Sequence, residues 1–224
     1  MTTSAKTSKN TTVFTDIQQA VAWIKQGQIL VYPTESVWGI GCDPFNQKAV
    51  QTVLQLKSRP QEKGMIVVTD KLSRIASLIA PLSDEQRQRL TQSISQLSLI
   101  NLNLPTAQQQ AQTWLLPLMD NQNYQPDIPQ WITGNHDSVA VRVIAHPMIK
   151  QICQQMVSEE NPYGFIVSTS CNQAGQPPAN SLEQAQASFA NHKLAKHIGY
   201  LQGDTLGYQL PSQIRDIRTG QVLR

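Results

Sequence analysis

The chain has 224 residues, of which 40% are apolar and 15% are charged, and its formal net charge is +3. A chain of this length can bury about 70% of its unfolded surface, so it needs no disulfide or metal to fold. So small a positive excess argues against a histone-like binder, whose affinity comes from many clustered cations.

Apolar residues occur at helical spacing or in short continuous runs, and the two patterns alternate along the chain. Residues 1–12 are polar and predict a disordered tail, which leaves 13–224 as one domain. Residues 70–130 show little periodicity, and 108–110 and 121–129 are predicted loops. In chain order, the first predicted elements are a helix that Thr15 caps and Gly27 ends, a strand at 29–32, a helix from Asn46 to about Lys57 and a strand at 65–68. A helix that begins at the capping box Ser83–Gln86 follows. The last predicted elements are a strand at 138–144, a helix from Pro147, a strand at 165–167 and a helix that Ser181 and Gln184 cap.

Short, continuously apolar strands that alternate with helices predict an α/β sheet covered on both faces. Ligands of such sheets bind in the crevice beyond the carboxyl ends of the strands. Polar residues that follow a predicted strand are therefore the first candidates for a functional site.

Two hydroxyls and a carboxylate, those of Thr34, Ser36 and Glu35, follow the first predicted strand. Gly39 and Gly41 come next and allow the backbone to approach a neighbour closely. The segment predicts either a ligand contact or a tight strand–turn connection. It lacks the third glycine of a dinucleotide-binding fingerprint.

Three cations, Lys57, Arg59 and Lys63, lie between a predicted helix end and a predicted buried strand. In one interpretation, Lys57 and Arg59 complement the negative end of the helix dipole. In the other, Pro60 fixes the chain direction and all three cations face one pocket, which would bind phosphate or carboxylate. No P-loop motif occurs in the sequence.

Arg142 interrupts the apolar run at 138–144. A buried cation must be paired with an acid or must reach a crevice, and the sequence leaves both possibilities open. The segment Ser168–Asn172 follows another predicted strand, and its hydroxyl and amide groups predict either phosphate or base contacts or a polar turn. No His or Asp is placed to activate these serines, so we predict no catalytic triad.

The segment around Ser212 carries three arginines, Arg215, Arg218 and Arg224, and is typical of a solvated basic tail. The three cysteines, at positions 42, 153 and 171, include no C-x-x-C pair and predict buried free thiols in a reducing cytosol. The histidines form no H-E-x-x-H motif, so we predict no protein-bound metal.

No apolar run approaches the roughly 18 residues that a membrane span requires, and the polar N-terminal segment lacks the apolar core of a secretory signal. We therefore expect a soluble, cytoplasmic protein with no membrane contact.

Five segments, taken in this order, resemble the YrdC/TsaC family of threonylcarbamoyl-AMP synthases in its short bacterial form. They extend from Tyr32 to Arg224, and the pair K-x-R (Lys57, Arg59) and S-x-N (Ser170, Asn172) is the signature of the family. The segments read YPTESVWGIGCDP, LKSRPQEKGMIVV, DSVAVRVIAHP, VSTSCNQAGQPPA and PSQIRDIRTGQVLR.

The resemblance implies a single YrdC-like domain, in which helices flank a twisted mixed β-sheet with a concave, positively charged cavity. It implies a nucleotidyltransferase that joins L-threonine, bicarbonate and ATP into threonylcarbamoyl-AMP and diphosphate, with Mg²⁺ carried by ATP. A tRNA threonylcarbamoyl-transferase complex would then modify the adenosine next to the anticodon in tRNAs that read codons beginning with A, and direct tRNA contact is possible.

By the same resemblance, each candidate residue takes a role. The assignments are Lys57 and Arg59 to catalysis; Arg59, Lys63, Ser138, Ser170, Asn172 and Arg224 to ATP; and Thr34, Ser36, Arg142, Ser168 and Ser212 to threonine. One segment departs from the family pattern: at Gln109–Trp114 only Thr113 and the following apolar residues match, and residues 91–127 are longer than usual.

Two other functions fit parts of the sequence. A non-catalytic module that binds tRNA or ribosomal RNA would use the basic face, but the low net charge and the lack of aromatic residues near the cations count against it. A sugar-phosphate enzyme would need an acidic metal-binding cluster, which the motifs do not supply.

Overall fold

The computed structural model describes residues 11–100, 109–118 and 128–224. The helices are α1 (Ile17–Lys25), α2 (Gln47–Leu56), α3 (Ala76–Ile79), α4 (Asp84–Ile100), α5 (Gln130–Thr133), α6 (Pro147–Gln155) and α7 (Leu182–Phe189). The strands are β1 (Thr12–Phe14), β2 (Ile29–Pro33), β3 (Trp38–Gly41), β4 (Ile66–Thr69), β5 (Gln112–Pro117), β6 (Ser138–Val143), β7 (Ile166–Val167), β8 (Thr169–Ser170), β9 (Ile198–Leu201) and β10 (Gln213–Asp216).

These strands form two mixed five-stranded sheets, with the orders β1-β9-β2-β3-β8 and β10-β5-β6-β4-β7. The α/β class and the mixed pairing agree with the prediction, but the expected single sheet is divided in two. The sheets meet where β7 is followed by β8, because only Ser168 separates the two strands. The main-chain N–H of Ser168 donates to Ile66 O of the second sheet, and that of Val167 donates to Cys42 O beside the first.

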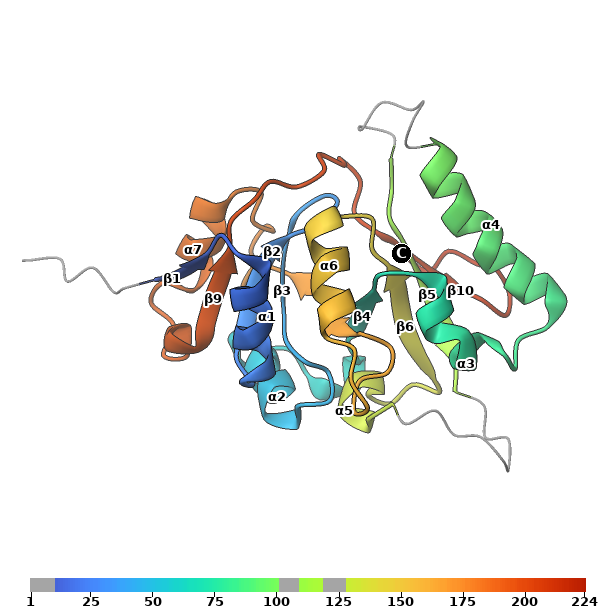
Figure 1. The fold of residues 1–224 in the computed structure, drawn as a ribbon, viewed down its shortest axis with the longest axis horizontal. Coiled ribbons are helices and arrows are strands. Elements are labelled where there is room, and N and C mark those ends of the chain that lie inside the picture. Colours follow the sequence, from blue (N-terminus) through green and yellow to red (C-terminus); the bar gives the residue numbers. More distant parts are fainter. Residues whose placement is uncertain (1–10, 101–108, 119–127) are drawn as a thin grey trace, which may run out of the picture.

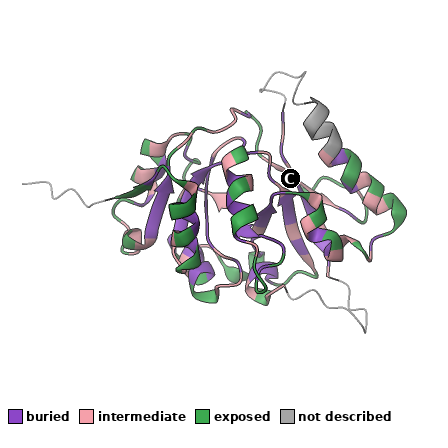
Figure 2. Cartoon of the chain, in the orientation of Figure 1, coloured by how far each residue is buried: buried purple, intermediate pink, exposed green. Residues whose placement is uncertain are grey.

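Strand β2 shows why its apolar run is continuous. Ile29 and Val31 pack into one core cluster, whereas Leu30 and Tyr32 pack into the other. Successive side chains of a strand point to opposite faces, so a strand covered on both faces needs apolar residues at every position. Figure 2 shows the buried strands between helices whose outer faces are exposed.

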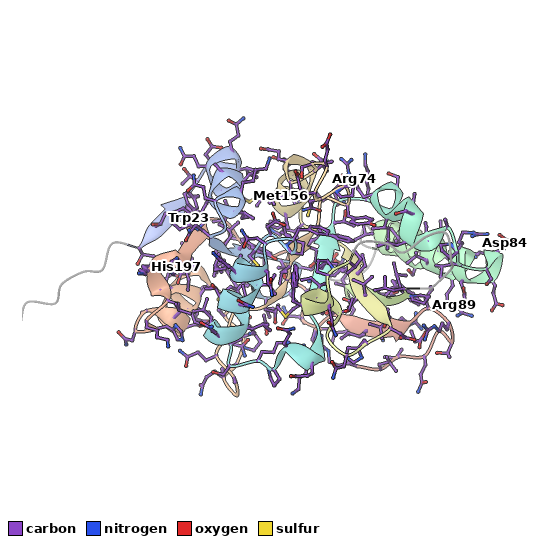
Figure 3. The ribbon with its side chains drawn as sticks, turned by 90° about the horizontal axis from the view of Figure 1, so that it is seen from below. Trp23, Arg74, Asp84, Arg89, Met156 and His197 are labelled. Atoms are coloured by element: carbon purple, nitrogen blue, oxygen red, sulfur yellow. The ribbon has the colours of Figure 1, made fainter. Side chains whose placement is uncertain are left out.

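Helices α1 and α6 lie side by side over one face of the molecule, and α4 lies at the end that carries β5 and β10 (Figure 1). The indole N–H of Trp23 in α1 donates to Ile29 O at 2.9 Å, which ties the helix to the strand that follows it. Trp23 and His197 lie at the end opposite Asp84 and Arg89 of α4 (Figure 3).

Several predicted helix ends are confirmed. The Ser83–Gln86 capping box forms in both directions, at 3.0 and 3.3 Å, and Ser181 caps α7 by accepting the N–H of Gln184. Pro147 occupies the first turn of α6.

Other predictions at the N-terminal end of the chain are wrong. Asp16, and not Thr15, caps α1, since its carboxylate accepts the N–H of Gln18 at 2.7 Å. Strand β1 begins at Thr12, inside the predicted tail, because Thr12 pairs with Gly199 of β9; residues 1–10 lie outside the described residues.

Within the described part of the chain, no helix is both long and apolar enough to cross a bilayer.

Candidate active site

A cavity of about 990 Å³ is lined by residues from both sheets. This volume is at the upper end of the range for small-molecule sites. Of the predicted site residues, only Lys57 and Asn172 do not line this cavity. Those that line it are Thr34, Ser36, Arg59, Lys63, Ser138, Arg142, Ser168, Ser170, Ser212 and Arg224.

The charged side chains of this lining are basic. They are Arg59, Lys63, Arg142 and Arg224, and the described residues of the lining include no Asp or Glu. Burial lowers the pKa of Arg59, and the nearby guanidinium of Arg224 lowers it further. Two cations held close together in a partly buried space favour the entry of an anion between them.

The turn after α2 aims Arg59 into the cavity. Ser58 adopts a positive φ of 47°, and the N–H groups of Ser58 and Arg59 donate to Gln55 O and Leu54 O at 3.2 and 2.9 Å, which is the Schellman pattern of a helix C-terminus. The Arg59 guanidinium donates to Gly64 O at 2.9 Å. The chain thus reverses and presents Arg59 to the cavity, so dipole complementation is not its whole role.

Lys57, the other half of the K-x-R pair, points elsewhere. Its ammonium donates to Ser170 O at 2.5 Å and to the main-chain and side-chain oxygens of Asn172 at 2.9 and 3.1 Å. The Ser170 hydroxyl also donates to Asn172 Oδ1, at 2.6 Å. The two halves of the predicted signature therefore bind each other, and only Arg59 and Ser170 reach the cavity. Burial lowers the pKa of Lys57 to about 8.

Arg142 satisfies both possibilities that the sequence left open. Its Nη1 lies 3.6 Å from Glu35 Oε2, its Nη2 donates to the hydroxyl of Ser168 at 3.2 Å, and it lines the cavity. It is therefore paired with an acid and available to a ligand. Ser168 reaches Arg142 because Ser168 lies between β7 and β8, where the chain crosses from one sheet to the other.

The segment Thr34–Ser36 is likewise both a turn and part of the lining. The Thr34 hydroxyl donates to Val37 O at 2.7 Å, which closes the connection between the antiparallel strands β2 and β3. The close approach expected of the glycines occurs at Gly41, where a Cβ would lie 1.6 Å from Val167 O.

The C-terminal residues are exposed, but they do not form a free tail. Arg224 O accepts the N–H of Ile214, and Leu223 N–H donates to Ile214 O, so the last residues pair with β10. This pairing brings the guanidinium of Arg224 to 3.4 Å from the hydroxyl of Ser212. Arg215 contributes differently, because its guanidinium lies over the ring of Trp114.

The segment between β9 and β10 also lines the cavity, and no motif in the sequence pointed to it. The N–H groups of Leu206 and Tyr208 donate to Thr34 O and Glu35 O at 3.1 and 3.0 Å. These bonds join backbone groups, so no side-chain motif could have revealed them. The lining residues missed here are Thr205, Gly207, Tyr208 and Gln209, and the polar residues Thr133, His136 and Asn180 were missed elsewhere.

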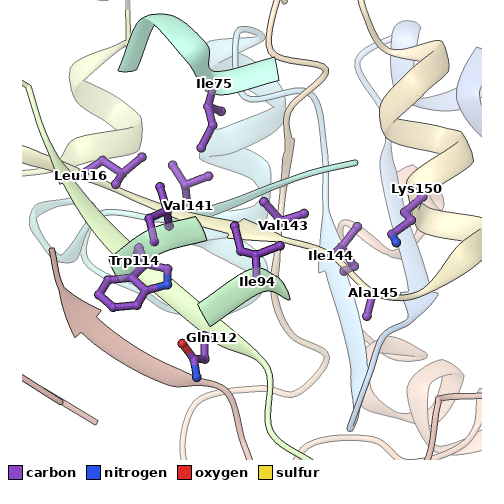
Figure 4. A pocket seen from close by; sticks show the side chains of 11 residues that line it. Ile75, Ile94, Gln112, Trp114, Leu116, Val141, Val143, Ile144, Ala145 and Lys150 are labelled. Carbon is purple, nitrogen blue, oxygen red and sulfur yellow. The ribbon is translucent and has the colours of Figure 1, made fainter. Parts of the chain in front are cut away.

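The segment that departs from the family pattern lies at the edge of the site. The side-chain amide of Gln110 donates to Pro211 O at 2.7 Å. Gln112 begins β5 and lines a second cavity of about 70 Å³, together with apolar residues such as Ile75 and Trp114 (Figure 4). No predicted site residue lines this smaller cavity.

The three cysteines are free and buried, as predicted. Burial raises the pKa of each thiol, so none is a ready nucleophile. Within the described ranges, no group of three or more His, Cys, Asp or Glu side chains could hold a metal ion.

Comparison with known proteins finds curated relatives over nearly the whole chain and solved structures with a similar fold. The threonylcarbamoyl-AMP synthases of Psychrobacter arcticus and Psychrobacter cryohalolentis are 59% and 56% identical to it, each over 97% of this chain and 100% of the relative. The structure of P. abyssi Sua5 complexed with L-threonine shares the fold, with a TM-score of 0.64 and 22% identity over 89% of this chain and 50% of that one. The Sua5/YciO/YrdC family model, described as telomere recombination, matches residues 22–224. The chain belongs to the Sua5/YciO/YrdC family.

Proposed function

We propose that the chain is a threonylcarbamoyl-AMP synthase that uses L-threonine, bicarbonate and ATP. Threonine and bicarbonate first condense to an N-carboxy adduct with loss of water. A carboxylate oxygen of this adduct then attacks the α-phosphorus of ATP, the bond from that phosphorus to the bridging oxygen breaks, and diphosphate leaves. The name of the 59% identical relative supports this reaction, and the observation that carries it is the convergence of Arg59, Arg142 and Ser170 on one cavity.

The basic lining suits this chemistry because both reactants are anions. The carboxylate and the triphosphate repel each other, and fixed cations that face both of them lower the cost of bringing them together. Holding them in line supplies a further part of the rate, since well-oriented reactants can gain about 7–11 kcal/mol. No covalent enzyme intermediate is needed, which agrees with the absence of an activated nucleophile among the described lining residues.

We assign the lining residues to two groups by substrate. Arg59, Lys63, Ser138, Ser170 and Arg224 contact ATP, and Thr34, Ser36, Arg142, Ser168 and Ser212 contact threonine. Lys57 and Asn172 act on ATP through Ser170, because their polar groups are used within the K-x-R and S-x-N pairs. Lys57 is therefore a positioning residue in this proposal.

Mg²⁺ enters this proposal with ATP and not on protein ligands. The described lining offers hydroxyls and cations but no carboxylate, and carboxylates are the side chains by which proteins hold Mg²⁺. When bound to ATP, the ion would neutralise charge on the leaving diphosphate.

The product would pass to a tRNA threonylcarbamoyl-transferase complex in the cytoplasm. Threonylcarbamoyl-AMP is a mixed anhydride that water can hydrolyse, so transfer close to the site of synthesis would preserve it. Direct contact of this chain with tRNA is part of the same proposal.

The test is diphosphate release by the purified protein. We expect release only when ATP, threonine and bicarbonate are all present. Release that does not depend on threonine would contradict the reaction. A protein that binds RNA with a steep salt dependence and releases no diphosphate would instead be an RNA-binding module.

A further inference from the structure

Glu35 is an acid that lies directly behind the basic wall of the cavity. Its side chain is only 1% exposed. Oε1 accepts the N–H of Ala145 at 2.8 Å, and Oε2 has no hydrogen-bond partner within the described part of the chain. A buried carboxylate with one unsatisfied oxygen is costly unless a cation compensates it, and the cation nearest to Oε2 is Arg142, at 3.6 Å.

The guanidinium of Arg142 also has an N–H donor without a hydrogen-bond partner among the described residues. Its Nη2 donates to Ser168, but its Nε has no hydrogen-bond partner among the described residues, and 3.6 Å to Glu35 is too long for a hydrogen bond. Glu35 therefore supplies charge without occupying the planar fork of the guanidinium. Arg142 lines the cavity, and its Nη1 and Nη2 groups keep N–H donors that can bind a carboxylate at two points.

We propose that Glu35 is the resident counter-ion of Arg142, which neutralises the guanidinium in the empty cavity and competes with the carboxylate of the incoming amino acid. Glu35 is a positioning residue, because it does not line the cavity and acts only through Arg142. The inference rests on the proposed function, which assigns Arg142 to the threonine carboxylate. Glu35 stabilises the substrate-free protein and at the same time weakens substrate binding, because two anions share one cation.

The variant that tests this competition is Glu35→Gln. Glutamine keeps the size of the side chain and an oxygen for the N–H of Ala145 but removes the charge. The unpaired guanidinium should make the free protein less stable and should attract the substrate carboxylate more strongly. We expect the dissociation constant for L-threonine to fall about tenfold, or about 1.4 kcal/mol. Binding of L-threoninamide, which has no carboxylate, should not change. Both are measured by ligand-dependent shifts in Tm.

Asp70→Asn is the matched control. The Asp70 side chain is also 1% exposed and lies 3.1 Å from a guanidinium nitrogen of Arg74, but neither residue lines the cavity. This variant should be less stable than wild type and should bind threonine with unchanged affinity. A tighter threonine complex in Asp70→Asn would overturn the inference, because loss of any buried carboxylate would then have the same effect.

Each remaining outcome also decides the question. Threonine binding by Glu35→Gln that is equal to wild type, or weaker, overturns the inference. If Glu35→Gln is unfolded without ligand, L-threonine but not L-threoninamide must restore the fold, and failure of this rescue overturns it. A wild-type protein that binds both compounds equally contradicts the assignment of Arg142 in the proposed function. If the wild-type protein binds L-threonine more tightly than L-threoninamide, but Glu35→Gln binds L-threonine as the wild type does, only the role of Glu35 is contradicted.

Discussion

The ammonium group of Lys57 lies 2.9 Å from the main-chain oxygen of Asn172 and 3.1 Å from its side-chain oxygen. With the further bond to Ser170 O, its three N–H donors all have acceptors. Lys57 is 8% exposed and has no donor left for a phosphate. It joins two segments more than a hundred residues apart, and so it determines where the Ser170 hydroxyl lies relative to Arg59.

Loss of the Lys57 proton should reduce activity at alkaline pH. Burial lowers its pKa to about 8, so raising the pH through this value removes one donor from the Ser170–Asn172 segment. We expect kcat/KM for ATP to fall with an apparent pKa near 8. In Lys57→Arg the guanidinium stays charged, so the profile of this variant should not fall in that range, whatever its absolute activity. The same decline in both proteins would contradict the role of Lys57.

Unfolding through this group does not explain such a decline. The unfolded amine has a pKa of about 10.4, so between pH 8 and that value the unfolded chain binds more protons than the folded one. The contribution of Lys57 to the free energy of unfolding therefore rises with pH across this window. Thermal unfolding measured between pH 7.5 and 9.5 separates the two effects.

Local signals in the sequence were sufficient where the structure depends on local contacts. The apolar run in β2, Pro147 in α6 and the Ser83–Gln86 box each depend on neighbouring residues, and each was predicted. Strand β5 was missed because Gln112 and Thr113, at its start, do not resemble a strand. These two residues pair with the distant β10, and the following residues of β5 pair with β6. A strand of this kind exists only when its partners are in place.

In the candidate site, too, some features follow from motifs in the sequence and others depend on the folded chain. Motif order predicted the convergence of Arg59 and Ser170, but the direction of Arg59 relative to Lys57 depends on the positive φ of Ser58, which no motif revealed. The contact of Glu35 with Arg142 joins β6 to the turn after β2. Only the folded topology brings these two residues together.

Replacement of Arg59 should strongly reduce catalysis and leave the fold intact. The guanidinium is partly exposed in the cavity and its hydrogen bonds go to local backbone oxygens, so Arg59→Ala should cost about 1 kcal/mol of stability or less. Diphosphate release should fall at least about a hundredfold, the size of effect typical of one lost charge-stabilising donor. Arg218→Ala is the control, because Arg218 forms an exposed pair with Asp137 and should retain wild-type activity. Undiminished turnover of Arg59→Ala would remove Arg59 from the mechanism.

Arg142→Lys should affect threonine more than ATP. Lysine keeps the positive charge opposite Glu35 but replaces a planar fork with a point charge, so the fold is kept and two-point binding of a carboxylate is lost. We expect the KM for threonine to rise about tenfold, the equivalent of about 1.4 kcal/mol, with the KM for ATP changed less than about twofold. Steady-state kinetics with each substrate varied in turn measures both. Equal increases would show that Arg142 does not belong to the threonine half of the cavity.

Gly41→Ala should destabilise the junction between the sheets. The added Cβ would lie 1.6 Å from Val167 O, the oxygen that also accepts the hydroxyl of Tyr32 at 2.8 Å. Relief of this clash must move β3 away from β7, so we expect a loss of more than about 4 kcal/mol, which is exceptional for one substitution. Gly175→Ala is the matched control: its φ is +77°, but no atom lies within 4 Å of the added Cβ. Its cost should be about 1–2 kcal/mol. Equal losses of unfolding free energy in urea would show that steric contact at Gly41 is not decisive.

Ser58→Gly should stabilise the protein without reducing activity. Ser58 holds a φ of +47° at the position where helices that end in a Schellman motif favour glycine. A non-glycine residue in this conformation costs about 1–2 kcal/mol, and the greater freedom of glycine in the unfolded chain offsets about 0.5–1 kcal/mol of the gain. The net gain of up to about 1 kcal/mol corresponds to a rise in Tm of about 2–4 °C. Ser58→Val should instead lower Tm, because a β-branched side chain fits this conformation worst. A lower Tm for Ser58→Gly would mean that the Ser58 side chain stabilises the protein by more than its backbone strain costs. A stabilised Ser58→Gly with reduced diphosphate release would mean that this strain keeps Arg59 in its catalytic position.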